Sequence, residues 1–141
     1  MLKGIPEILS PELLKILCEM GHGDEIVISD GNFPGASCGQ RLVRADGHTV
    51  CELLDAILTV FPLDSYSEVQ ASVMQVMPGD PYVPVIWEDF KAIVNQHEAV
   101  NNKFGDIERF EFYNRAKKAY AVVQTSDKAL YANILLTKGV L

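Results

Sequence analysis

Helix-like and strand-like segments alternate along most of the 141 residues, and this alternation is the feature that most constrains the fold. The clearest helix is predicted over residues 50–61, where apolar side chains recur at three- and four-residue spacing behind the N-cap Thr49. Pro62 ends that helix. The alternation favours an α/β fold, a three-layer sandwich in which helices cover a largely parallel central sheet. Because no linker or repeat divides the chain, a single domain over residues 1–141 is expected.

The other segments follow the same pattern. A first helix is predicted from the N-cap Ser10 to Met20, and Gly21 is expected to end it in a left-handed conformation. Short apolar or alternating runs predict strands at residues 25–29, 41–45, 71–77, 107–110, 120–125 and 133–137, of which 71–77 is expected to be half-buried. Further helices are predicted at about 85–99 and 113–118, and residues 30–39 are predicted to form a glycine-rich loop.

The charge of the chain argues against two classes of partner. The formal net charge is −7, and residues 45–100 contain nine acidic side chains against one basic side chain, Lys91. An acidic chain lacks the positive surface that phosphate backbones and anionic membranes require, so no nucleic acid or membrane partner is expected. The N-terminal residues do not form a signal peptide and no segment is long enough to span a membrane, so a cytoplasmic location is expected.

The three cysteines form no metal-binding or disulfide pattern. Cys18, Cys38 and Cys51 are odd in number and contain no CxxC pair, and Cys18 and Cys51 are expected to be buried free thiols within helices. A metal site built from His22, Asp24 and Asp30 would combine one imidazole with two carboxylates, which is a weak signal.

A scattered set of polar and aromatic residues lies near predicted strand and helix ends. The set comprises His22, Asp30, Asp64, Arg109, Tyr113, Tyr131 and Asn133. An imidazole exchanges protons near neutral pH, although histidine is also favoured at a helix end without any function. A turn carboxylate such as Asp64 is commonly solvated, and Tyr113 fits ordinary core packing as well as a shared helix face with Arg109. Tyr131 and Asn133 suit contacts to a sugar, but asparagine is also a common turn residue.

Several longer runs together resemble the sugar mutarotases of the RbsD/FucU type. The runs are Met-Gly-His-Gly-Asp-Glu at 20–25, Arg-Ala-Asp-Gly at 44–47, Pro-Leu-Asp-Ser-Tyr at 62–66, Glu-Arg-Phe-Glu-Phe-Tyr at 108–113, Tyr-Ala-Asn-Ile at 131–134 and Leu-Leu-Thr-Lys-Gly-Val at 135–140. They follow one another in collinear order over essentially the whole chain. The runs at 62–66 and 109–113 are similar to the branch of the family that acts on L-fucose.

The resemblance implies an isomerase that interconverts the α and β anomers of L-fucose by acid–base ring opening and closure, without cofactor or metal. It implies catalytic roles for His22, Asp64 and Tyr113, with His22 as proton donor. We expect His22 to act at the ring oxygen and the other two at the anomeric hydroxyl, and the sequence leaves open which group is the acid in each half-reaction. It implies substrate contacts for Asp30, Met74, Arg109, Tyr131 and Asn133. It also implies a homo-oligomer, between a dimer and a decamer, with sites near the subunit contacts. Nothing is transferred to residues 78–106, where lengths differ within the family.

Two other functions remain open at this point. The ribose-type branch shares the features matching His22 and Asp30 and would act on D-ribose instead. A non-catalytic sugar-binding protein would keep the pocket without accelerating anomer exchange.

Overall fold

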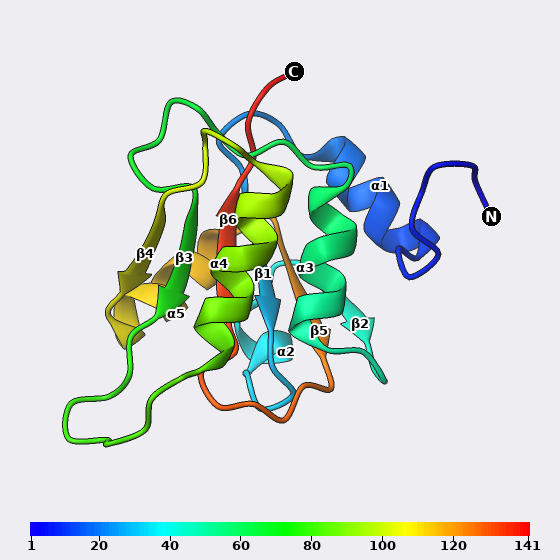
Figure 1. Ribbon diagram of the computed structural model, residues 1–141. Coiled ribbons are helices and arrows are strands. Elements are labelled where there is room, and N and C mark those ends of the chain that lie inside the picture. Colours follow the sequence, from blue (N-terminus) through cyan, green and yellow to red (C-terminus); the bar gives the residue numbers. More distant parts are fainter.

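Helices cover both faces of one central sheet in the computed structural model, which describes residues 1–141 (Figure 1). The strands are β1 (Glu25–Ser29), β2 (Leu42–Ala45), β3 (Ala71–Met74), β4 (Phe104–Ile107), β5 (Ala121–Thr125) and β6 (Ile134–Thr137). The helices are α1 (Pro11–Glu19), α2 (Gly35–Cys38), α3 (Val50–Leu58), α4 (Ile86–His97) and α5 (Arg109–Lys118). The predicted three-layer α/β architecture is confirmed.

The six strands are ordered β2-β5-β1-β6-β3-β4. Neighbouring strands are parallel in the pairs β2–β5, β5–β1 and β3–β4. Strand β6 runs antiparallel to both of its neighbours, β1 and β3. The sheet is therefore mixed but mostly parallel, and the carboxyl ends of five strands share one edge with the start of β6.

Two apolar clusters fill the space on either side of the sheet. Successive strand residues point to opposite faces, so Ile26 and Ile28 of β1 join the larger cluster with α1, α3 and α4, while Val27 joins the smaller one with α5. Because both faces of the central strands are buried, their sequences are continuous apolar runs. This burial leaves polar groups only at the strand ends, which is where a site can form.

The helix boundaries follow from their caps. The Thr49 side chain accepts from the Glu52 amide and the Glu52 carboxylate accepts from the Thr49 amide, a capping box that starts α3 as predicted. Ser10 caps α1, but that helix ends at Glu19 and its C-cap Met20 is extended. The prediction of a left-handed Gly21 was wrong, because the positive φ of this turn belongs to Gly23 (+84°).

Four other local predictions were wrong. Strand β3 is fully buried and stops at Met74, so the predicted half-buried strand to residue 77 is too long. Of the predicted strand 107–110 only Ile107 is in a strand, as the last residue of β4, because Glu108 caps α5 with its carboxylate and the helix begins at Arg109. Residues 35–38 of the predicted loop form the single turn of α2. All three cysteines are free, but Cys18 is exposed and Cys51 only partly buried, because both lie beside the apolar stripes of their helices.

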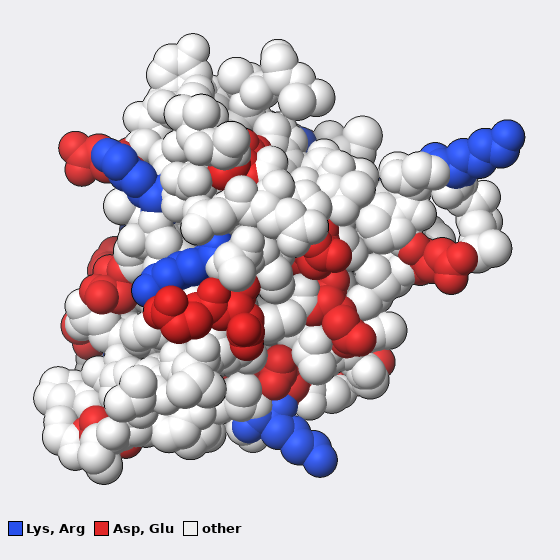
Figure 2. Space-filling model, viewed as in Figure 1, with Lys and Arg blue, Asp and Glu red and all other residues white.

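The outer face of α3 and α4 is acidic. Figure 2 shows acidic side chains gathered on the face in view, with few basic ones among them. Glu52 and Asp55 of α3 and Glu88 and Asp89 of α4 are exposed there. None of the helices combines the length and apolar character needed to cross a membrane.

Candidate functional site

A cleft of about 340 Å³ opens at the edge of the sheet where β1 and β3 end and β6 begins. This edge faces downward in Figure 1. Its volume falls within the range of small-molecule sites. Eleven residues line the cleft: Asp30, Asn32, Phe33, Met74, Met77, Asp80, Arg109, Tyr113, Leu130, Tyr131 and Asn133. We call it the Asp30 cleft. It contains six of the eight site residues predicted from the sequence.

Asp30 and Asn133 form the polar floor of the cleft. The Asn133 amide donates to Asp30 Oδ2 (3.0 Å) and accepts from the Asp30 backbone N–H (3.0 Å), so the two buried residues hold each other in place across β1 and β6. Asp30 Oδ1 accepts from the Asn32 N–H (2.9 Å). Burial raises the pKa of Asp30 above its ordinary value, although hydrogen bonds from Asn32 and Asn133 oppose this shift. The result is a fixed carboxylate that can accept from a sugar hydroxyl.

Helix α5 supplies Arg109 and Tyr113 from one face, as their four-residue spacing predicts. The Arg109 guanidinium lies 5.7 Å from the centre of the Tyr113 ring, which also packs against Phe33 with ring centres 5.7 Å apart. Arg109 donates to Met77 Sδ and pairs with no carboxylate, which leaves most of its N–H groups for a ligand. Tyr113 is half-buried and lines the cleft, so it is more than a core residue.

Met74 and Tyr131 complete the wall of the cleft. Met74 is the last residue of β3 and is buried against the smaller apolar cluster. Tyr131 has a φ of +58°, a left-handed conformation that is unusual for a tyrosine, and it lies three residues before the start of β6. An aromatic ring and apolar side chains beside a polar floor suit a ligand with one apolar face and several hydroxyl groups.

The remaining two predicted residues form a separate pair. His22 Nε2 lies 2.9 Å from Asp64 Oδ1, and the side chain of His22 is 46% exposed whereas that of Asp64 is 4% exposed. Tyr66 packs against the imidazole with ring centres 5.3 Å apart. The alternative of a solvated turn carboxylate does not hold for Asp64, because Leu63–Asp64 pairs with the end of β6. We call these two residues the His22–Asp64 pair.

The environment of Asp64 fixes its charge and the tautomer of His22. A hydrogen bond from Ser67, with smaller contributions from the Tyr66 amide and His22, lowers the pKa of Asp64 to about 2. Asp64 is therefore ionised at neutral pH and can only accept hydrogen bonds. His22 must then carry a proton on Nε2, and its Nδ1 is the atom that can exchange a proton with a ligand. With its oxygens occupied, Asp64 orients the imidazole.

The Asp30 cleft and the His22–Asp64 pair lie at opposite edges of the sheet. Asn133 stands at the start of β6, whereas Lys138 follows its end and exchanges backbone hydrogen bonds with Gly23 and Asp24, beside His22. The two ends are roughly 16 Å apart, from a rise of about 3.3 Å per strand residue. Asp30 is equally remote from His22 and Asp24, so the weak metal site considered from the sequence does not assemble, and nowhere do three potential metal-binding side chains gather.

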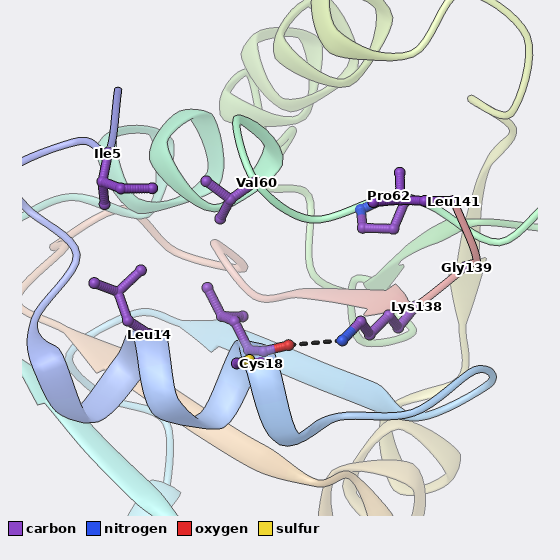
Figure 3. Close-up of a pocket in the computed structure, with 9 residues that line it drawn as sticks. Ile5, Leu14, Cys18, Val60, Pro62, Lys138, Gly139 and Leu141 are labelled. Atoms are coloured by element: carbon purple, nitrogen blue, oxygen red, sulfur yellow. Dashed lines mark hydrogen bonds between the residues drawn. The ribbon is translucent and has the colours of Figure 1, made fainter. Parts of the chain in front are cut away.

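Lys138 also fastens α1 to the turn that carries His22. Its ammonium group donates to the carbonyl oxygens of Leu17 (2.7 Å) and Met20, at the end of α1. The dashed line in Figure 3 marks the first of these two contacts. Lys138 lines a second cavity of about 400 Å³, whose other walls are mainly apolar and include Ile5, Leu14 and Val60. The ammonium is committed to the helix end, and the Cys18 thiol is the one other titratable side chain that lines this cavity. Lys138 fixes the position of the His22 turn.

Sequence reasoning missed four residues that shape these two places: Ser67, Met77, Asp80 and Lys138. Ser67 lies three residues after Asp64, a spacing at which a serine hydroxyl can reach a turn carboxylate, so a local signal existed. Met77 and Asp80 belong to the loop between β3 and α4, whose fold over Tyr131 no local pattern predicts.

Comparison with known proteins gives concordant results. The RbsD / FucU transport protein family matches residues 3–141. The fucose mutarotase of Homo sapiens is 50% identical over 147 aligned residues, which cover 99% of this chain and 94% of that protein. The fucose mutarotase of Streptococcus pneumoniae in complex with L-fucose superposes with a TM-score of 0.94 at 48% identity, covering 99% of both chains. Bacillus subtilis RbsD complexed with D-ribose shares the fold at a TM-score of 0.75 and 21% identity, covering 100% of this chain and 99% of that one.

Proposed function

Because this chain belongs to the RbsD/FucU family, we propose that it is an isomerase that interconverts the α and β anomers of L-fucose. The observation that carries the proposal is identity of about half of all residues to fucose mutarotases over nearly the full length. The ribose-binding relative shares only the fold at 21% identity, so L-fucose is the favoured substrate. The Asp30 cleft supplies the polar and aromatic groups that a pyranose would need.

The reaction requires two proton transfers and no redox change. One group removes the proton of the anomeric hydroxyl as another protonates the ring oxygen, and the bond between the anomeric carbon and the ring oxygen breaks to give the open aldehyde. The aldehyde rotates, and the reverse transfers close the ring on its other face. A positioned acid or base contributes about 10²–10⁴-fold to such a step.

The Asp30 cleft holds the sugar in this proposal. Asp30 and Asn133 bind hydroxyl groups, Arg109 donates further hydrogen bonds, and Tyr131 and Met74 pack on the apolar side of the ring. Tyr113 faces the same cleft and takes part in the proton transfer at the anomeric hydroxyl. His22 in its imidazolium form donates the Nδ1 proton to the ring oxygen and is left as the neutral imidazole with its proton on Nε2 towards Asp64. Asp64 acts through His22 and does not touch the hydroxyl itself, because its oxygens already accept from His22, Tyr66 and Ser67.

A second copy of the chain must then supply His22 to each cleft. Within one chain the width of the sheet separates His22 from Asp30 by roughly 16 Å or more, which exceeds any proton-transfer distance. Exposed apolar side chains lie in and beside the Asp30 cleft: Met77 and Leu130 line it, and Phe110 lies next to its Arg109, as expected of a surface that a partner covers. We therefore infer a homo-oligomer whose active sites lie between copies.

Mixing two inactive variants tests this arrangement. His22→Ala removes the acid and Asp30→Ala removes the cleft carboxylate, so each assembly alone should lose anomer exchange. In assemblies formed from an equal mixture, about a quarter of the sites pair an intact cleft with an intact His22, and about a quarter of wild-type exchange should return. If every site came from one chain, mixing would restore nothing. Mixed Asp30→Ala and Asn133→Ala, both within the cleft, form the matched control and should stay inactive.

Saturation-transfer NMR of anomer exchange tests the activity and its alternatives. Exchange of L-fucose should be accelerated far more than that of D-ribose. Greater acceleration of D-ribose would favour the ribose-type activity. Saturable L-fucose binding without exchange would identify a binding protein. Unaltered exchange in folded His22→Ala would refute the role of His22.

A further inference from the structure

The loop between β3 and α4, residues 75–85, closes on Tyr131. The Tyr131 hydroxyl lies 2.5 Å from Asp80 Oδ2, and the Tyr82 ring stacks on the Tyr131 ring with centres 5.9 Å apart. The Met77 N–H points to the same hydroxyl oxygen (3.4 Å). Three residues of a loop that carries no assigned function thus converge on one side chain of the cleft.

The backbone of Tyr131 is held in place from the other side. Its left-handed φ of +58° is disfavoured for a residue with a large side chain and persists only where the surroundings impose it. The Trp87 indole N–H, from the first turn of α4, donates to the Tyr131 carbonyl oxygen (3.0 Å). With the backbone fixed by Trp87, the direction of the phenol is set by Asp80 and Tyr82.

The contact with Asp80 also determines whether the Tyr131 hydroxyl can donate a hydrogen bond to a ligand or accept one from it. A carboxylate can only accept, so the single hydroxyl proton of Tyr131 points to Asp80. The phenol oxygen accepts from the Met77 N–H and keeps one further acceptor position for a ligand. Asp80 Oδ1 accepts from the Tyr82 N–H (2.9 Å) within the loop, and Asp80 Oδ2 accepts from Tyr131, so both carboxylate oxygens have a partner. The Asp80 hydrogen bond raises the pKa of Tyr131 and lowers that of Asp80, as expected for this polarity.

We propose that Asp80 is a positioning residue of the sugar site, which holds the Tyr131 ring against the cleft and commits its oxygen to accepting from a sugar hydroxyl. The inference rests on the proposed function of the cleft. Asp80 acts through Tyr131 and does not contact the sugar.

The double-mutant cycle of Asp80→Asn and Tyr131→Phe tests the proposal. Asparagine keeps the oxygen that accepts from Tyr82, but its amide donates to the phenol and reverses the polarity of the contact. We expect the KM for L-fucose to rise about tenfold in Asp80→Asn, the factor of one net hydrogen bond, with little change in kcat. In the Tyr131→Phe background the same Asp80 substitution should have no further effect. Asp89→Asn removes an exposed carboxylate of α4 and should match the wild type.

The outcomes separate this inference from the proposed function. Isothermal titration of L-fucose on the same four proteins measures the coupling even without turnover, and circular dichroism confirms folding. An unchanged KM and Kd in Asp80→Asn, or losses that add fully in the double variant, would overturn the role of Asp80 while wild-type exchange still supports the mutarotase. A wild-type protein that binds L-fucose without exchanging it would refute the function and leave the coupling to be judged by Kd.

Discussion

Replacing Asn133 by aspartate should make the free energy of unfolding depend strongly on pH, because it destabilises the floor of the Asp30 cleft. The substitution keeps the shape of the side chain but replaces the amide nitrogen, which donates to Asp30 Oδ2 across 3.0 Å, by an oxygen. Both residues are buried, with 5% of each exposed. Two carboxylates would therefore face each other out of water, with no donor between them.

The structure sets the size of this effect. Two unit charges about 3 Å apart repel by roughly 5 kcal/mol at an effective dielectric constant of about 20. Binding one proton at pH 7, to a group with an ordinary pKa near 4, costs about 4 kcal/mol and restores a donor between the oxygens. The pair that shares one proton therefore has a lower free energy than the pair with two charges, so Asn133→Asp should lose up to about 4 kcal/mol of unfolding free energy at pH 7.

The sign of the pH dependence follows from the shared proton. The pair raises the folded pKa of one carboxyl above its unfolded value, so stability is fully present below the unfolded pKa and is lost as the pH rises. The deficit relative to wild type should shrink by about 1.4 kcal/mol for each pH unit from 7 downward and nearly vanish close to pH 4.

Urea denaturation at fixed protein concentration, at several pH values between 4 and about 8, measures this deficit. Asn95→Asp makes the same chemical change at an exposed position of α4 and should cost little at every pH. A deficit for Asn133→Asp that stays constant with pH, or that equals the deficit of the control, would refute the reasoning.

Three further substitutions test the region around the His22–Asp64 pair. Ser67→Ala should raise the pKa of Asp64 from about 2 towards its ordinary value, because the serine hydroxyl is the main group stabilising the carboxylate. The stability that Asp64 contributes above its ordinary pKa would then be lost at a higher pH on acidification, and carbon NMR titration of the carboxyl group reports the midpoint. Gly139→Ala would place a Cβ 2.4 Å from the Leu63 carbonyl oxygen and should lower stability by about 2 kcal/mol together with anomer exchange; an unchanged Tm and rate would contradict this. Lys138→Met removes the ammonium from the end of α1 and should cost about 2 kcal/mol in urea denaturation, with faster amide exchange in α1; unaltered protection of α1 would count against it.

The sequence predicts the elements whose signal is local. The periodic apolar stripe and the N-cap Thr49 define the start of α3, although the helix ends at Leu58, three residues before the predicted end. The apolar runs define β1 and β5 to within a residue. Periodicity fails where a tertiary contact decides the ending. Glu108 could have continued the strand before it, but its carboxylate caps the two amides that begin α5.

The residues of the site were predicted better than their arrangement. Resemblance to the family singled out all eight candidates, and six of them line one cleft. The separation of His22 from Asp30 follows from the strand predicted between them at residues 25–29. The placement of Asn133 beside Asp30 could not be read from the sequence, because it depends on the antiparallel direction of β6. Nor could the role of Asp80, since its partner Tyr131 lies 51 residues further along the chain.

The direction of β6 explains why association has to complete the site in our proposal. Asn133 and Lys138 lie at the two ends of the buried strand β6. Asn133 forms hydrogen bonds with Asp30, and Lys138 forms hydrogen bonds with the turn that carries His22. A strand bonded on both sides within a sheet does not shorten, so no loop closure in one chain can bring His22 to the sugar. A loop that closed over the cleft could exclude water but could not supply the imidazole of His22. Contact with a second copy can exclude water and supply His22, because the copy that covers the apolar residues of one cleft can also present its own half-exposed imidazole there.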